Sequence, residues 1–367
     1  MTRLVSDEIM HLSTVNEFRL TFFHFSVNVE TFTRKHISIQ KRKCVQWKKP
    51  KDRITVLIGA SMIGEKLPLL IIGPAKKPCC FKGVSKLPVS FKANRKSWMT
   101  SLLFEEWLRK LDHKMKKHSR KIILIVDNFP AQPRIQDLEN VELMFLPPNT
   151  ASKLQPMDGG IIYTFKLRYK KRILLKRLAS LEANRDLSFS LLDALYALRL
   201  SWDSIPTTII VNCFHHCHFR VPSNDEVLEQ DAPFGDCDAE EMNETGNIFE
   251  TIRMLLNIPT AISFKEYIEV EDQLEVSPLL TDKEIIESMM APDDMLDDEV
   301  VVGDAEEIPP PSTNQILDSL FIIQTWAKKA EGVTLQDLNV LIHLENLALN
   351  VNKKTKQTVI TEYFSKS

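Results

Sequence analysis

Two aspartates are the residues of this chain best placed to do chemistry. Asp127 ends the stretch KIILIVD, whose short apolar run predicts a buried strand that delivers a carboxylate at its carboxyl end. Asp158 lies 31 residues later, after a second predicted strand (residues 141–146) and a polar loop that begins with Pro147 and Pro148. A single aspartate in either position would most simply be a turn or cap residue. The two aspartates together, with the residues that flank them, are a much more specific signal.

The flanks of both aspartates resemble the catalytic blocks of a known family. LIVDNFPA and LPPNTASKLQPMDGGIIYTFK are similar to the second and third catalytic blocks of the pogo/Tigger transposases, which are related to centromere protein B and the jerky proteins. Other blocks agree in order over roughly residues 20–220. The resemblance implies an α/β fold, with a ribonuclease-H-like mixed sheet flanked by helices, and a DDE-type endonuclease site. Such a site hydrolyses or transfers phosphodiesters with two Mg²⁺ or Mn²⁺ ions held by carboxylates.

By this resemblance, Asp127 and Asp158 take the second and third acidic positions and are the expected catalytic and metal-binding residues. The family's first acid ends the first strand of the sheet, and the residue aligned with it here is Val29. A valine offers no oxygen to a metal ion. Glu30 is adjacent, but one step along a strand turns a side chain to the opposite face. We therefore expect Mg²⁺ or Mn²⁺ to bind weakly, with little or no strand cleavage.

Three functions are compatible with these features. The first is a transposase-derived, nuclear, nucleic-acid-binding protein with a degenerate, inactive DDE domain, favoured by Val29. The second is a working divalent-metal-dependent DNA endonuclease or strand transferase, favoured by the intact Asp127 and Asp158. The third is an interaction scaffold without DNA contact. Residues 1–20 leave no room for the two helix-turn-helix modules of the related transposases. We therefore expect weakly sequence-specific DNA binding, and the chain could be a truncated or incomplete gene product.

Charge is unevenly distributed along the chain, although the formal net charge is only −2. Residues 34–177 are dense in lysine and arginine, whereas residues 222–307 are strongly acidic. This asymmetry suggests a nucleic-acid-facing domain followed by an acidic segment. The helix predicted after Asp158 has one apolar face and an opposite basic face, which either contacts phosphate or is simply solvated. The candidate DNA-binding residues on the basic face are Lys166, Arg168, Lys170, Lys171, Arg172, Lys176 and Arg177.

The rest of the chain is expected to fall into distinct segments. Residues 1–20 form a divergent N-terminal segment, and residues 21–220 form the DDE endonuclease-like domain. Residues 221–312 are acidic and punctuated by prolines, which predicts a mostly disordered linker, in which short apolar stretches such as residues 248–258 can form isolated helices. Residues 313–350 have helical spacing and predict a C-terminal helical element that either self-associates or packs within the chain. No apolar run is long enough to span a bilayer, so no membrane partner is expected.

The tail, residues 351–367, contains the sequence QTVITEYF. Gln357, Ile360, Tyr363 and Phe364 have the spacing of the box that binds the sliding clamp PCNA. One tight helical turn would place Ile360 and the two aromatic residues on one side as an apolar plug, with Gln357 free to hydrogen-bond beside it. The alternative is a frayed tail with chance aromatic residues. Related pogo-type transposases carry such tails, so the resemblance implies PCNA as a partner.

Overall fold

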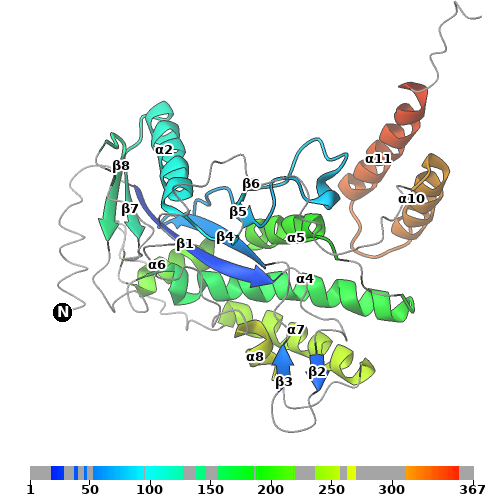
Figure 1. Ribbon diagram of the computed structural model, residues 1–367. Coiled ribbons are helices and arrows are strands. Elements are labelled where there is room, and N and C mark those ends of the chain that lie inside the picture. The colour runs from blue at the N-terminus through cyan, green and yellow to red at the C-terminus, as the bar shows by residue number, and fades with distance from the viewer. Residues whose placement is uncertain are drawn as a thin grey trace, which may run out of the picture. The chain divides into compact units, whose positions relative to one another are not determined.

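The computed structural model divides the chain into two compact units, Met1–Gly303 and Asp304–Ser367 (Figure 1). It describes residues 18–28, 37–39, 45–47, 53–94, 96–126, 135, 137–145, 155–185, 187, 189–217, 219, 236–256, 263–269 and 311–354. In the first three of these ranges, and in residues 236–238 and 351–354, it describes the backbone alone.

A six-stranded mixed sheet forms the centre of the first unit. Its strands lie in the order β6 (Ser90–Ala93), β5 (Leu70–Gly73), β4 (Arg53–Ser61), β1 (Phe18–Asn28), β7 (Ile122–Val126) and β8 (Val141–Phe145). β4 is antiparallel to β1 and β5, whereas β7 is parallel to β1 and β8. This is the ribonuclease-H-like arrangement, with β6 added parallel to β5, so the predicted fold class is confirmed. A separate ribbon pairs β2 (Ile37–Ile39) with β3 (Val45–Trp47).

Helices cover both faces of this sheet. Side chains alternate along β4, so that Val56 joins the core on one face and Leu57 the core on the other. The helix α2 (Ser101–Lys117) packs on the Leu57 side, and the hydroxyl of Thr100 caps it by accepting the Leu103 N–H at 3.3 Å. Three helices cover the Val56 side: α4 (Ile162–Glu182), α5 (Leu191–Ser204) and α6 (Thr207–His216). A short 3-10 turn, η1 (Cys79–Phe81), lies against α5.

The helix α4 is apolar on two sides and therefore packs against two layers. Phe165 and Tyr169 face the sheet, whereas Leu167 and Leu174 belong to a different buried cluster. That cluster is completed by α7 (Asp236–Leu255) and α8 (Phe264–Glu269), which supply its aromatic residues. Both helices lie within the predicted disordered linker. The prediction of disorder is therefore wrong for residues 236–247 and 263–269, because apolar residues at helical spacing outweigh the acidic composition there. Residues 248–255 are helical, as the apolar stretch allowed, but they pack on α4 instead of forming an isolated helix.

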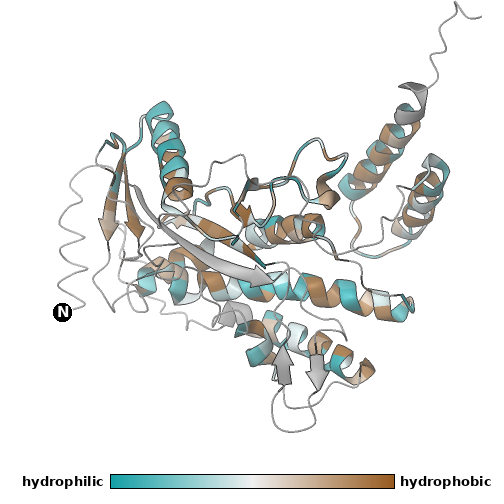
Figure 2. Cartoon of the chain, viewed as in Figure 1, coloured by the Kyte–Doolittle hydropathy of each residue, from teal (hydrophilic) through white to brown (hydrophobic). Residues whose placement is uncertain are grey.

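The second unit contains a helical hairpin of α10 (Thr313–Ala327) and α11 (Leu335–Lys354). The predicted C-terminal helical element is thus confirmed, with α11 running a few residues further than expected. Gln324 links the helices by donating its amide N–H to the carboxylate of Glu345 at 2.9 Å. Figure 2 shows hydrophobic residues recurring along both helices. Across the part of the chain that the structure describes, no helix is long and apolar enough to cross a membrane.

Candidate functional site

Asp158 lies in the first turn of a helix that begins as η2 (Met157–Ile161) and continues as α4. Its neighbours Gln155 and Met157 are buried, whereas Asp158 itself is exposed. The free N–H groups of a first helical turn favour a negative charge, so this position stabilises the ionised carboxylate. An exposed, ionised carboxylate is the form that binds a hard divalent cation.

Two glycines after Asp158 let the helix start pack tightly. A Cβ atom on Gly159 would lie 3.3 Å from Cys217 Sγ, so the Cys217 side chain would have to shift by a few tenths of an ångström to admit it. Gly160 has φ 134°, a conformation that favours glycine. Cys217 itself is buried. Burial raises the pKa of the Cys217 thiol to about 12, and the charge of Asp158 adds to that increase. The wall behind Asp158 is therefore apolar and uncharged at neutral pH.

The strand β7 is fully buried and ends at Val126, the residue before Asp127 in the sequence. The parallel ladder between β1 and β7 runs to the pair Thr21–Ile125. By the same register Val126 lies beside Phe22, while β1 continues to Asn28. At about 3.3 Å per residue, the two strand ends are about 20 Å apart along β1. This register does not bring the two strand ends together.

Asp127 and Val29 both lie outside the described residues. Their roles as the second acid and the lost first acid therefore stay predictions. Among the residues that the structure does describe, no three His, Cys, Asp or Glu side chains are grouped to hold a metal ion. Asp158 alone supplies one hard oxygen donor group, which fits Mg²⁺ or Mn²⁺ in kind but needs further ligands to complete a site.

The proposed DNA-binding residues of α4 are distributed over its whole circumference. Lys166, Lys170 and Arg177 are buried, with exposed fractions of 7%, 1% and 6%. The ammonium group of Lys170 lies 4.8 Å from the ring centroid of Tyr267 on α8, a cation–π contact. These three side chains are thus placed in the interior rather than on the exposed basic face that the sequence indicated. The physical reason is the layer of α7 and α8, which covers the side of α4 away from the sheet.

The other four cations of α4 contact groups within the same unit. Arg168 lies 3.0 Å and Lys171 3.7 Å from the Glu241 carboxylate, and Lys171 lies 2.6 Å from that of Glu244, both acids being on α7. Lys176 pairs with Asp193 at the start of α5, at 2.7 Å. Arg172 donates weakly to the carbonyl oxygen of Leu200, at 3.4 Å. Of the seven candidates only Lys176 is classed as exposed.

The reasoning from sequence missed this partnership between α4 and α7. A usable signal was present, because Met242, Thr245, Phe249, Ile252 and Leu256 recur every three or four residues, as on one face of a helix. The acidic residues between them obscured the pattern. The four tail residues proposed to bind PCNA, Gln357, Ile360, Tyr363 and Phe364, lie outside the described residues.

Comparison with known proteins identifies the domain that holds Asp158. Residues 51–214 match the family described as DDE superfamily endonuclease. These residues are similar to the DDE superfamily endonucleases. The resemblance predicted from the blocks around Asp127 and Asp158 is confirmed.

Individual relatives agree with the family match. Over 183 residues the chain is 41% identical to the mouse (Mus musculus) Tigger transposable element-derived protein 4, covering 50% of this chain and 36% of that protein. Over 172 residues it is 32% identical to the mouse major centromere autoantigen B, covering 46% of this chain and 28% of that protein. The match thus spans about a third of the length of these relatives. The chain is similar in this region to proteins derived from Tigger transposable elements and to centromere autoantigen B.

Solved structures are more distant. The Mos1 mariner paired end complex with Mn is similar at a TM-score of 0.36 and 11% identity, covering 59% of this chain and 56% of that one.

Proposed function

We propose that this protein is a nuclear, nucleic-acid-binding protein whose DDE domain has lost strand cleavage. The proposal rests on Val29, the residue that the resemblance aligns with the family's first metal-binding acid. Asp127 and Asp158 then supply two of the three expected carboxylates. Mg²⁺ or Mn²⁺ would be held weakly by these two residues and water, and when bound would polarise a phosphodiester. The position of Asp158, exposed at a helix start, supports the retained part of that site.

A nicking assay on supercoiled DNA with Mg²⁺ or Mn²⁺ tests the loss of cleavage. The unmodified protein is expected to nick no faster than its Asp127→Ala variant. Val29→Asp adds a carboxylate at the aligned position, and its Mn²⁺ binding is measured by calorimetry against the matched control Val29→Leu. Tighter binding by Val29→Asp alone would support the alignment, whereas equal binding would agree with the β1–β7 register, which leaves the ends of these strands about 20 Å apart. Robust nicking by the unmodified protein that disappears in Asp127→Ala would instead establish a working endonuclease.

Nucleic-acid binding is proposed to use the exposed part of the basic surface. Lys176 is the candidate on α4 whose side chain is open to solvent, 43% exposed. Duplex DNA should bind weakly, with an affinity that falls steeply as salt rises, because phosphate contacts release counterions. Lys176→Glu is expected to lower the salt slope by about one, and Lys117→Glu, at the end of α2, is the matched control on another surface. Absence of any salt-sensitive binding would favour the scaffold function.

The tail supports a second, separable contact, with the sliding clamp PCNA. Large aromatic residues bury much area at low entropic cost, and Tyr363 and Phe364 would serve as anchors beside Ile360. A peptide spanning residues 353–367 is expected to bind PCNA in the micromolar range by calorimetry. Changing both aromatic residues to alanine should abolish the signal. No heat of binding from the unmodified peptide would exclude this contact.

Self-association is proposed to use the second unit. In the α10–α11 hairpin, Phe321, Ile322 and Trp326 are exposed, and two copies could cover them. Sedimentation of the full chain should show a dimer that Trp326→Glu converts to a monomer. An unmodified chain that stays monomeric at high micromolar concentration would reject this proposal.

A further inference from the structure

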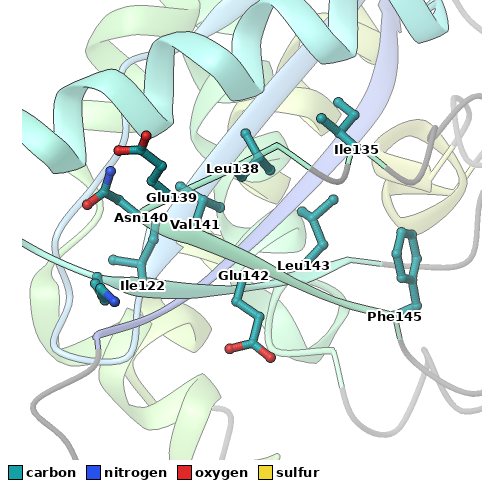
Figure 3. Close-up of a pocket in the computed structure, with 10 residues that line it drawn as sticks. Ile122, Ile135, Leu138, Glu139, Asn140, Val141, Glu142, Leu143 and Phe145 are labelled. Atoms are coloured by element: carbon teal, nitrogen blue, oxygen red, sulfur yellow. The ribbon is translucent and has the colours of Figure 1, made fainter.

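A groove that the DDE chemistry does not use runs along β8, and Lys121 and Ile122 at the start of β7 also line it. The groove has a volume of about 580 Å³, and its apolar wall is formed by Ile135, Leu138, Leu143 and Phe145. Figure 3 shows Leu138, Leu143 and Phe145 on one side of the β8 ribbon, while the carboxylate of Glu142 points to the other side. β8 is the last strand of the sheet order, and no described strand pairs with its outer edge.

The backbone of β8 presents hydrogen-bonding groups to this edge. Ile122 N–H donates to the carbonyl oxygen of Asn140 at 2.9 Å, in register with the pair Ile122–Val141. In a parallel ladder this register turns the backbone N–H and C=O groups of every second residue of β8, Glu142 among them, toward β7. The backbone N–H and C=O groups of Leu143 and Phe145 therefore point away from β7, to the outer edge.

The start of the edge is already closed by a side chain. Asp112 of α2 accepts the N–H groups of Asn140 and Val141, at 2.7 and 3.0 Å. An added strand would therefore pair with the edge from the carbonyl of Val141 onward. Edge groups that no described strand pairs, beside an apolar groove, are the arrangement that extended peptides use when they add a strand to a sheet.

We propose that the β8 edge binds an extended peptide segment of a partner protein as a seventh strand. The partner carries small apolar residues at alternate positions, for the groove, and a lysine or arginine on the other face, beside Glu142. Glu142 is exposed, and it has no ion-pair partner among the described residues. Glu139, at the rim, already pairs with Lys116 at 2.6 Å.

The charge and polarity of the groove favour a basic extended peptide over two other occupants, a nucleic acid and a second copy of β8. A nucleic acid is disfavoured because four apolar side chains form one wall of the groove, and its charged residues are the two acids Glu139 and Glu142 beside the single cation Lys121. A second copy of β8 is disfavoured because antiparallel pairing would bring two Glu142 carboxylates into neighbouring positions, which is destabilising. A basic extended peptide satisfies the backbone groups, the groove and the carboxylate together.

The probe is a synthetic peptide, TVKVTVKVT, with blocked ends, added to the full chain and followed by fluorescence anisotropy. Two further versions carry N-methyl groups on alternate backbone amides, in the two possible registers. Strand addition uses the amides of one register alone, so one methylated peptide should lose binding and the other should keep it. Equal loss in both versions, or no binding by the parent peptide, would overturn the proposal.

Variants of the protein locate the contact. Leu143→Pro removes the outward N–H while leaving the groups that pair with β7, since an edge strand tolerates proline there. It should abolish binding, with thermal unfolding as the check on folding. Glu142→Lys should weaken binding about five- to tenfold, and Glu182→Lys, at the far end of α4, should leave it unchanged. Equal weakening by both lysine variants would show non-specific charge attraction and overturn the proposal, whatever Leu143→Pro does.

Discussion

Two helical contacts outside the sheet bury their aromatic residues to very different extents. Where α7 and α8 pack on α4, Phe249 and Tyr267 are 0% and 1% exposed. In the α10–α11 hairpin, Phe321 and Trp326 are 70% and 64% exposed. The first contact has the burial of a domain core, and the second leaves apolar surface open for further packing.

The difference shows that composition alone does not decide burial. The segment that forms α7 is acidic, yet its carboxylates lie at the rim and pair with Arg168 and Lys171, while its apolar residues meet α4. The hairpin is rich in apolar residues, but two helices alone have too little facing surface to bury them. What decides burial is whether a second layer is available on the apolar side.

The largest expected effect is a difference between the two contacts in how much an alanine substitution lowers the free energy of unfolding. Phe249→Ala leaves a cavity in a fully packed cluster and should lower the free energy of unfolding of the first unit by about 3–5 kcal/mol. Phe321→Ala, in the hairpin, should change stability by about 0.5 kcal/mol or less. Chemical denaturation of the full chain, followed by tryptophan fluorescence and by circular dichroism, measures both. Similar small effects would mean that α7 is not part of the core.

A buried cation gives the next largest effect. Lys170→Glu places an acid against the Tyr267 ring and the apolar residues around it, and should destabilise the first unit by about 3 kcal/mol or more. Lys328→Glu, at the exposed end of α10, is the matched charge reversal and should cost about 1 kcal/mol at most. Thermal unfolding distinguishes these outcomes. If Lys170→Glu folds normally and loses only DNA binding, the lysine would be a phosphate contact instead of a core residue.

Much of the sheet could be predicted from sequence because its signals are local. The runs before Asp127 and around residues 54–60 are apolar, β-branched and bounded by breakers, so strands β7 and β4 followed directly. The position of Asp158 at a helix start was also predictable, because the residues next to Asp158 in the sequence resemble the third catalytic block of the family.

The surroundings of α4 could not be read in the same way. Lys166, Lys170 and Arg177 lie on a helix whose basic pattern is typical of a solvated or phosphate-binding face. Their burial depends on α7, which follows more than fifty residues later and whose apolar stripe is interleaved with acids. The register of β1 against β7 was likewise out of reach, because a continuous apolar strand has no internal mark that fixes its pairing.

The smallest expected effect concerns the first turns of α8 and α11, one helix from each of the two contacts. α8 begins with a capping box in which Ser263 N–H and hydroxyl donate to Glu266 at 2.7 and 2.9 Å. α11 begins with the same device, in which Thr334 N–H and hydroxyl donate to Asp337 at 2.9 and 2.7 Å. The backbone and side-chain hydrogen bonds of Ser263 lower the pKa of Glu266, and those of Thr334, the hydroxyl first, lower the pKa of Asp337.

A carboxylate whose pKa is lowered in the folded state stabilises that state above its ordinary pKa, and this contribution is lost as the pH falls through the lowered value. Both helix starts should therefore weaken in acid, below the ordinary values of 4.5 for Glu266 and 3.8 for Asp337. α11 should fray first, because α8 is also held by the buried Tyr267 and Ile268. The start of α10, capped by the neutral pair Ser312 and Gln315, should not respond to pH.

Carbon-13 NMR titration of the full chain measures the pKa values of Glu266 and Asp337. Amide hydrogen exchange, corrected for its intrinsic pH dependence, measures the fraying of α8, α10 and α11. Thr334→Ala should return Asp337 to its ordinary pKa, and fraying of α8 before α11 would contradict the difference in burial.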